Sequence, residues 1–202
     1  MNIDFRNNNT FTSRNATIRY ADDLARRVNR EFPRLSASKM ETLGFAKYYQ
    51  PTIERLWDKN HEMRDVVEAI INSKKPIKEK LMKILYCIQN RKVGNCGESA
   101  LLTYITAKLN KIDNCKFACL ISGNGFDLDH SVILVEDKKP YVIDAWLGFA
   151  DYIPNAIKKY QNEYKNCFDF DYVNTNEIII KPDKRSRYIK FAEKITDKDF
   201  NF

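Results

Sequence analysis

The spacing of apolar residues divides the chain into a helical first half and a strand-rich second half. Four stretches share the three- to four-residue spacing of an amphipathic helix: residues 21–32, 36–49, 51–73 and 77–90. Pro33 ends the first stretch, whereas Pro51 and Pro76 stand where the third and fourth begin, which is a favoured place for proline in a helix. A fifth helix is predicted to begin at Cys96.

After residue 114 the pattern changes to short runs of β-branched and aromatic residues. Five of these runs are predicted to be strands: residues 116–122, 130–135, 141–146, 176–181 and 187–191. The segment 136–140 is short enough to close a hairpin, and residues 155–164 have the pattern of a short helix. This order predicts an α+β fold in which the helical N-terminal half packs on an antiparallel β-sheet.

Length and composition indicate one domain. The chain has 202 residues, of which 44% are hydrophobic, which is enough for one folded core. The first 15 residues are rich in Asn, Thr and Ser, so we expect a disordered tail at 1–15 and a single domain at 16–202. The N-terminus lacks the pattern of a conventional secretory signal, and no apolar run is long enough to span a membrane.

The net charge of +7 permits an acidic partner, such as nucleic acid, an anionic membrane or an acidic protein. The basic residues are scattered along the sequence, and Pro182 and Asp183 interrupt the densest run, KPDKRSRYIK. No nucleic-acid-binding motif accompanies them. We therefore expect a solvated basic surface, no nucleic-acid partner and no stable membrane contact. A nucleic-acid or membrane binder is an alternative that rests on net charge alone, and salt-sensitive binding would support it.

Cysteine usage argues against disulfides and metal sites. There are five cysteines, an odd number, and the chain has no conventional secretory signal. Cys115 and Cys119 have no second Cys or His pair at the spacing of zinc ligands, so we expect no metal and no cofactor.

Cys96 differs from the other cysteines in its local sequence, GNCGES. Asn95 can cap the predicted helix, and Glu98, three residues later, can complete a capping box. The helix dipole and the unpaired backbone N–H groups of the first turn then favour the thiolate, which is the nucleophilic form of cysteine. The flanking glycines leave room for a substrate. Cys96 is therefore a candidate nucleophile.

A nucleophilic cysteine needs a base, and the chain has only two histidines. His61 lies on the polar side of a predicted helix, so we expect it to be exposed to solvent. His130 opens the strand 130–135. Folding the hairpin symmetrically about Asp137 places His130 opposite Asp144, at a distance where the carboxylate can orient the imidazole. A register shift of one residue would move Asp144 to the other face of the sheet.

This set of residues resembles the transglutaminase-like branch of the papain-like superfamily of cysteine-dependent enzymes. That family's pattern is basic-x-Gly-x-Cys-x-acidic-x-Ala, then a His that opens an apolar strand, then an apolar pair before an Asp. The resemblance covers roughly a third of the chain, and the matching residues are Lys92, Gly94, Cys96, Glu98, Ala100, His130, Val142, Ile143 and Asp144. The chain departs from many members at Lys92, where Arg is common, and at Ala145, where Pro is common.

The resemblance implies a papain-like or transglutaminase-like core and acyl chemistry on an amide of a protein substrate. Cys96, His130 and Asp144 would form the catalytic triad. The outcome can be peptide cleavage, glutamine deamidation or glutamine cross-linking. Because the family includes deamidase domains of bacterial toxins and effectors, the protein is expected either in the cytoplasm or as an effector exported without a conventional signal. The alternative is a catalytically inactive, papain-like binding module that recognises a partner protein.

Four further residues are candidates for the oxyanion and substrate sites. The backbone N–H of Cys96 is one expected oxyanion donor, and the second donor is a nearby side chain. Gln89 and Asn90, just before the cysteine segment, are candidates for that second donor, and Asn95 is another. Trp146, two residues after Asp144, is a candidate wall of the substrate groove.

Overall fold

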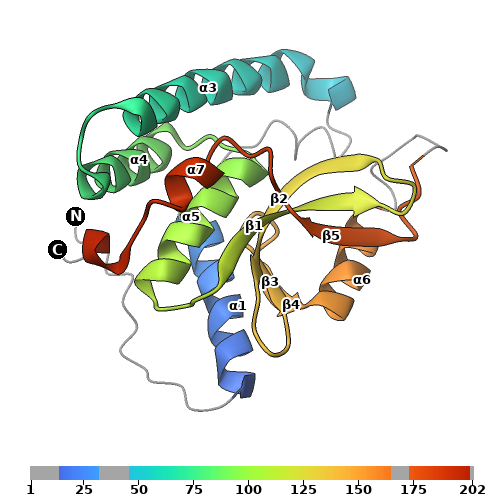
Figure 1. Ribbon diagram of the computed structural model, residues 1–202. Coiled ribbons are helices and arrows are strands. Elements are labelled where there is room, and N and C mark those ends of the chain that lie inside the picture. The colour runs from blue at the N-terminus through green and yellow to red at the C-terminus, as the bar shows by residue number, and fades with distance from the viewer. Residues whose placement is uncertain (1–13, 32–45, 165–172, 201–202) are drawn as a thin grey trace.

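The computed structural model describes residues 14–31, 46–164 and 173–200 and has the α+β architecture expected from the sequence (Figure 1). Within these residues, the helices are α1 (Arg14–Glu31), α3 (Ala46–Asn72), α4 (Ile77–Arg91), α5 (Cys96–Leu109), α6 (Ile153–Tyr164), α7 (Ile189–Ala192) and the 3-10 helix η1 (Asp197–Phe200). The strands are β1 (Cys115–Ser122), β2 (Asp127–Val135), β3 (Tyr141–Asp144), β4 (Phe149–Tyr152) and β5 (Ile178–Pro182). No described helix is both long and apolar enough to cross a membrane.

The five strands form one antiparallel sheet in the order β4-β3-β2-β1-β5. Helices α5 and α1 pack on one face of it, and α6 packs on the other (Figure 1). Alternation along β2 divides its side chains between the two faces. Ile133 and Val135 join the larger core cluster with α5, whereas Val132 and Leu134 join the smaller cluster with α6.

Helix α5 is the central helix of the molecule. All ten residues from Glu98 to Ala107 are buried, because the sheet, α1 and the C-terminal helices contact it from several directions. Leu101, Leu102 and Ile105 are fully buried, as the apolar spacing predicts. Burial on all sides fixes the position of the helix start, where Cys96 lies.

Two predicted helix boundaries differ from the structure. Helix α3 begins at Ala46, so Pro51 lies inside it rather than at its start. Proline removes one main-chain hydrogen bond, and this loss falls near the beginning of a long helix that the remaining turns stabilise. Of the separate helix predicted at 36–49, residues 36–45 lie outside the described part of the chain. Its last four residues belong to α3. Of the tail predicted at 1–15, residues 1–13 also lie outside the described part of the chain. Arg14 and Asn15 belong to α1.

Two strand predictions also need correction. The run 187–191 does not form a strand and instead leads into α7. Its buried residues continue beyond the run with helical spacing, and they are Tyr188, Phe191, Ala192 and Ile195. Strand β4 has no predicted counterpart, because its four residues are too few for a recognisable alternation.

The β2–β3 register was predicted wrongly by two residues. Val142 pairs with Leu134 rather than with Val132, so the hairpin is centred on Lys138 instead of Asp137. Side chains alternate between the faces with a period of two, and an even shift therefore preserves the face. His130 and Asp144 consequently lie on the same side of the sheet, but they are diagonal neighbours rather than directly opposed.

Candidate active site

Cys96 is the first residue of α5, as predicted. Asn95 has an extended backbone and caps the helix, and its N–H donates to the Glu98 carboxylate over 2.8 Å, so that the capping box is formed. The Cys96 side chain is partly exposed, and its thiol donates to the backbone carbonyl of Asp129, with a sulfur–oxygen distance of 3.3 Å. The local sequence therefore presents the sulfur at the N-terminal end of a rigid helix.

His130 and Asp144 form a buried pair. Their side chains are 2% and 1% exposed, and Nε2 of His130 lies 2.7 Å from Oδ2 of Asp144. This bond occupies one ring nitrogen and leaves Nδ1 as the nitrogen for the Cys96 side. The structure thus brings together the base and the carboxylate that the sequence predicts, in spite of the register error.

Asp144 is held by three further donors. Its Oδ1 accepts the backbone N–H groups of Trp146 at 2.9 Å and Leu147 at 3.0 Å, in the turn that follows β3. Its Oδ2, besides meeting His130, accepts the hydroxyl of Tyr160 on α6 at 3.1 Å. Hydrogen bonds from these donors replace the water that the buried carboxylate has lost.

Aromatic rings enclose His130 on the α6 side of the sheet. The ring centroids of Trp146, Tyr160 and Tyr164 lie 5.0, 5.8 and 6.2 Å from that of His130. Cys96, in contrast, belongs to α5 on the other face. The two side chains meet near the beginning of β2, next to Asp129, whose positive φ of 49° bends the chain there.

The charge environment of His130 combines opposing effects. Burial lowers its pKa, but the charge of Asp144, the hydrogen bond to Asp144 and the interaction with Cys96 together outweigh burial and raise the pKa to about 10. His130 is therefore an imidazolium at neutral pH, next to the sulfur.

The other described cysteines are in different environments. Burial raises the pKa of Cys87 and of Cys119, and it raises the pKa of Cys115 to about 12. All three are free thiols, and a protonated thiol is a weak nucleophile. Cys167 lies outside the described residues.

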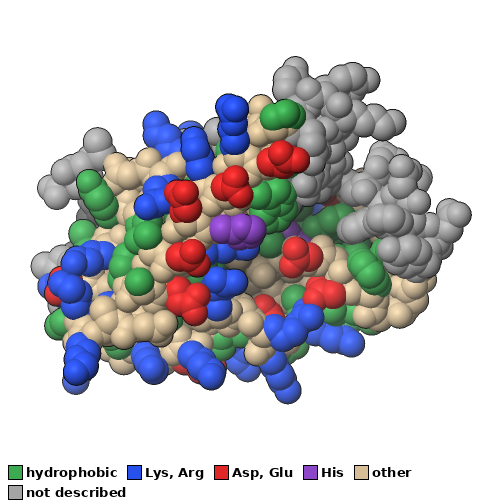
Figure 2. Space-filling view, turned by 90° about the horizontal axis from the view of Figure 1, so that it is seen from above, with side chains coloured by type: hydrophobic (Ala, Val, Ile, Leu, Met, Phe, Trp, Pro, Cys, Tyr) green, Lys and Arg blue, Asp and Glu red, His purple; other side chains and the backbone are tan. Residues whose placement is uncertain are grey.

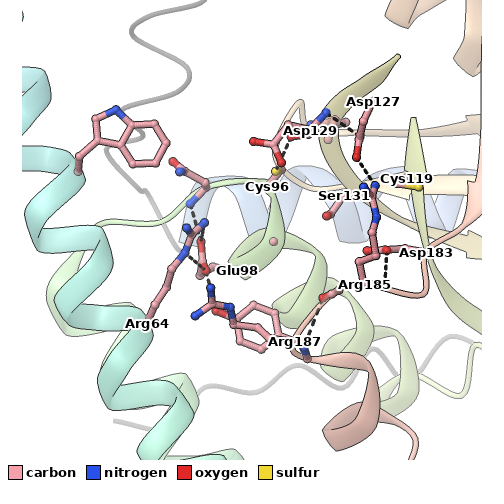
Figure 3. A pocket seen from close by; sticks show the side chains of 16 residues that line it. Arg64, Cys96, Glu98, Cys119, Asp127, Asp129, Ser131, Asp183, Arg185 and Arg187 are labelled. Carbon is pink, nitrogen blue, oxygen red and sulfur yellow. Dashed lines mark hydrogen bonds and ion pairs between the residues drawn. The ribbon is translucent and has the colours of Figure 1, made fainter. Parts of the chain in front are cut away.

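Cys96 and His130 open into a cavity of about 350 Å³ (Figure 3). Its walls come from α3, the start of α5, strands β1 and β2, and the segment 183–188 that connects β5 to α7. The other residues that line it are Trp57, Arg64, Asn95, Gly97, Glu98, Cys119, Asp127, Asp129, Ser131, Asp183, Arg185, Ser186, Arg187 and Tyr188. Arg185 pairs with Asp127 across the strand side of this cavity.

A buried ionic cluster supports the helix start beneath the cavity. Glu98 is 1% exposed and accepts Nε of Arg64, on α3, at 2.9 Å. It also accepts the hydroxyl of Tyr188 at 2.6 Å, and Figure 3 shows Arg64 reaching from α3 to Glu98. The carboxylate at the cap is thereby compensated, and α3, α5 and the C-terminal segment are tied together at the sulfur.

Of the remaining predicted site residues, one lines the cavity and the others do not. Asn95 lines the cavity, whereas Gln89 and Asn90 lie on α4 and do not. The Asn90 amide instead donates to the carbonyl of Tyr86 in its own helix at 2.7 Å. Trp146 packs on the ring of His130 and does not line the cavity, so it supports the base rather than walling the groove. His61 is exposed, as expected.

Sequence reasoning missed several residues that the fold adds to the site. Arg64, Tyr160 and Tyr188 each reach Glu98 or Asp144 from a separate element. A buried acid at a helix start needs a cation or hydroxyl partner, so Glu98 in the sequence predicts that such a partner exists. It does not say which arginine or tyrosine supplies the partner.

The side chains at the cavity include a possible nucleophile, the Cys96 thiol, and a possible proton carrier, the His130 imidazole. Of the described residues, no three or more His, Cys, Asp or Glu side chains are grouped as a metal site. The thiol, the imidazolium and the fixed carboxylate instead form the arrangement used for acyl transfer. No family model, no curated protein and no solved structure matches the chain.

Proposed function

We propose that the protein is a cysteine-dependent amide hydrolase or acyl transferase that acts on a protein substrate. The observation that carries this proposal is the meeting of Cys96, at a helix start, with the imidazole of His130, which is hydrogen-bonded to Asp144, inside one cavity. A papain-like or transglutaminase-like core is part of the proposal. A helix that begins with the cysteine, packed on an antiparallel sheet that carries the histidine and aspartate on adjacent strands, supports it.

In the first half-reaction, the Cys96 thiolate attacks the carbonyl carbon of a substrate amide. A carbon–sulfur bond forms, and the carbonyl oxygen becomes an oxyanion. The backbone N–H of Cys96, in the first turn of α5, can donate to this oxygen. Of the three predicted side-chain donors, Asn95 is the one that lines the cavity. His130 then protonates the leaving nitrogen, the carbon–nitrogen bond breaks, and a thioester remains on Cys96.

In the second half-reaction, His130 acts as a base. Because the sulfur carries no charge in the thioester, its contribution to the raised pKa of His130 is lost, and deprotonation becomes easier. His130 removes a proton from water, the oxygen attacks the thioester, and the carbon–sulfur bond breaks to give a carboxylic acid and free Cys96. A substrate amine in place of water gives a new amide instead. Asp144 holds the ring in one orientation throughout.

The reaction class includes glutamine deamidation, peptide cleavage and glutamine cross-linking, and deamidase or protease activity is our leading proposal. All three begin with the same thioester and differ in the leaving group and the acceptor. From the same family resemblance, we propose that the protein works in the cytoplasm or as an effector exported without a conventional signal.

The proposal predicts that iodoacetamide modifies Cys96 selectively. The experiment uses a Cys167→Ser background, sub-stoichiometric reagent and mildly acidic pH, followed by peptide mapping. Cys96 should react at least about tenfold faster than Cys87, Cys115 and Cys119, since burial keeps those three thiols protonated. His130→Ala should slow the reaction about tenfold or more, whereas His61→Ala, which changes the exposed histidine, should not.

Equal labelling of Cys96 and the buried cysteines would contradict an activated thiol and favour the inactive binding module. If Cys96 is selectively reactive, mass spectrometry of candidate protein substrates distinguishes the outcomes. Deamidation leaves the chain intact with a small mass gain, proteolysis divides it, and cross-linking joins two chains. Cys96→Ala is the matched inactive control.

A further inference from the structure

A second hollow lies between α3 and α4, which run side by side (Figure 1). Its volume is about 600 Å³, and its lining is predominantly apolar. Val66 and Ile70 line it from α3, and Met82 and Tyr86 line it from α4. Tyr86 is 71% exposed and Met82 is 51% exposed, and these are the two most exposed large hydrophobic side chains among the described residues.

The apolar residues of this groove form two rows. In each helix they are four positions apart, so they lie one above the other on the same side. Two such rows facing a common groove form a seat for the apolar face of a third helix, which presents residues at the same spacing. From Glu79 to Asn90, the α4 side of the groove is about 16 Å long, which corresponds to about three helical turns.

The net charge of the chain is concentrated next to this groove. Residues 74–92, which contain α4, have seven basic residues and one acidic residue, a net charge of +6 in a chain of +7. The basic residues are Lys74, Lys75, Lys78, Lys80, Lys83, Arg91 and Lys92. This local excess is present in the sequence itself, and Lys83 and Arg91 are the two of these basic residues that line the groove.

The opposite side of the groove has a different charge. Helix α3 carries an excess of exposed acidic residues among its described side chains, since Glu54, Asp58, Glu62, Asp65 and Glu68 outnumber the exposed basic residues Arg55 and Lys59. Seen from above α3, Asp and Glu side chains gather toward the middle of this face, and Lys and Arg lie mostly at its edges (Figure 2). Glu62 also meets Arg91 at 3.5 Å. A uniformly anionic membrane or nucleic acid would be repelled by α3 while being attracted by α4, whereas a protein helix can place its acids on one side only.

We propose that the α3–α4 groove binds an amphipathic helix of a partner protein, with apolar side chains between Val66, Met82 and Tyr86 and acidic side chains toward the lysines of α4. The groove is separate from the cavity with Cys96, since Trp57 and Arg64 of α3 line that cavity whereas Val66 and Ile70 line the groove. A bound helix would leave the cavity open, so the proposal does not depend on catalytic activity.

The test uses a synthetic helical peptide of about four turns, with Leu along one face and Glu beside it, added to the isotope-labelled full chain. We expect saturable amide shifts confined to α3 and α4. The variants Met82→Ala/Tyr86→Ser and Lys78→Glu/Lys83→Glu should each weaken binding at least about tenfold, and a peptide with Lys in place of Glu should bind at least about tenfold more weakly. All four positions are exposed, so the fold should persist, and circular dichroism checks this.

The matched control is Lys158→Glu/Lys190→Glu, which makes the same charge change at exposed positions of α6 and α7. It should leave peptide binding within about twofold. Absence of saturable binding, or equal weakening by the control, would overturn the proposal. So would tighter binding to phosphatidylserine vesicles or to duplex DNA than to the peptide. A dimer in sedimentation experiments that Met82→Ala/Tyr86→Ser abolishes would assign the groove to a second copy of the chain instead.

Discussion

At His130, two opposing effects act on one imidazole ring. Removal from water disfavours the charged ring, while the carboxylate 2.7 Å away favours it, and the carboxylate together with Cys96 prevails. In the proposed reaction, the ring therefore carries the proton for the leaving nitrogen before a substrate binds. This order of effects is needed for a leaving nitrogen to be protonated as the carbon–nitrogen bond breaks.

The protonation of His130 can be measured directly by NMR, because the chain has only two histidines and His61 serves as the reference resonance. We expect a pKa of about 10 for His130 in the unmodified protein. In Asp144→Asn the charge that opposes burial is removed, so the pKa of His130 should fall by several units. A pKa of His130 that Asp144→Asn leaves unchanged would mean that the pair is not coupled.

The members of the candidate site differ in how far they were predictable. Cys96, His130 and Asp144 were found because a capped helix start, a scarce histidine and a hairpin restrict the choices. Arg64 and Tyr188 were not predicted, because they lie 34 and 90 residues from Glu98 along the chain. They are also common residue types, and nothing in their local sequence indicates that they are buried at a site. Their placement depends on how α3 and the C-terminal segment pack on α5.

At the scale of elements, the start of α5 depends on one acidic residue. Glu98 receives the Asn95 N–H, the Arg64 guanidinium and the Tyr188 hydroxyl. Three separate parts of the chain therefore converge on the residue that caps the helix of Cys96. Loss of the carboxylate would leave Arg64 without its partner and the cap incomplete.

We expect Glu98→Ala to lower the free energy of unfolding by about 2–4 kcal/mol, since it removes a cap and one partner of a largely buried ion pair. Tyr188→Phe, which removes only one hydrogen bond, should cost about 1 kcal/mol. Urea denaturation measures both. Equal costs for the two variants would show that the charge of Glu98 is not what holds the cluster.

Elements were more predictable than their pairing. Helix α4 and helix α5 begin where Pro76 and Asn95 indicate, because proline and capping residues act locally. The β2–β3 register was wrong by two residues because the turn could be centred on Asp137 or Lys138 without changing which residues are buried. The pairing of Leu134 with Val142 distinguishes the two arrangements in the structure.

For the whole molecule, the raised pKa of His130 links folding stability to pH. The unfolded chain has a histidine pKa near 6.5 and the folded chain one of about 10, so the folded state binds this proton more tightly. The resulting stabilisation is fully present below pH 6.5 and is lost as the pH rises through about 10.

We therefore expect the free energy of unfolding to fall between pH 6.5 and pH 9.5, by up to a few kcal/mol at about 1.4 kcal/mol per pKa unit. The measurement is urea denaturation at several pH values. In His130→Ala this part of the slope should disappear, while His61→Ala should retain it. A slope that is the same in all three proteins would assign the pH dependence to other groups.

The sulfur belongs to a helix on one face of the sheet, whereas the imidazole extends from β2 toward the helix on the other face. Cys96 is part of α5, while the ring of His130 is packed among tyrosines of α6. The distance between the sulfur and the imidazole therefore depends on how the two helix layers pack on the sheet. A small shift of α6 would move the tyrosines that contact the His130 ring, and the orientation of the ring relative to Cys96 would change with them. In the proposed reaction, substitutions in the packing behind Tyr160 and Tyr164, away from the cavity, therefore alter the rate.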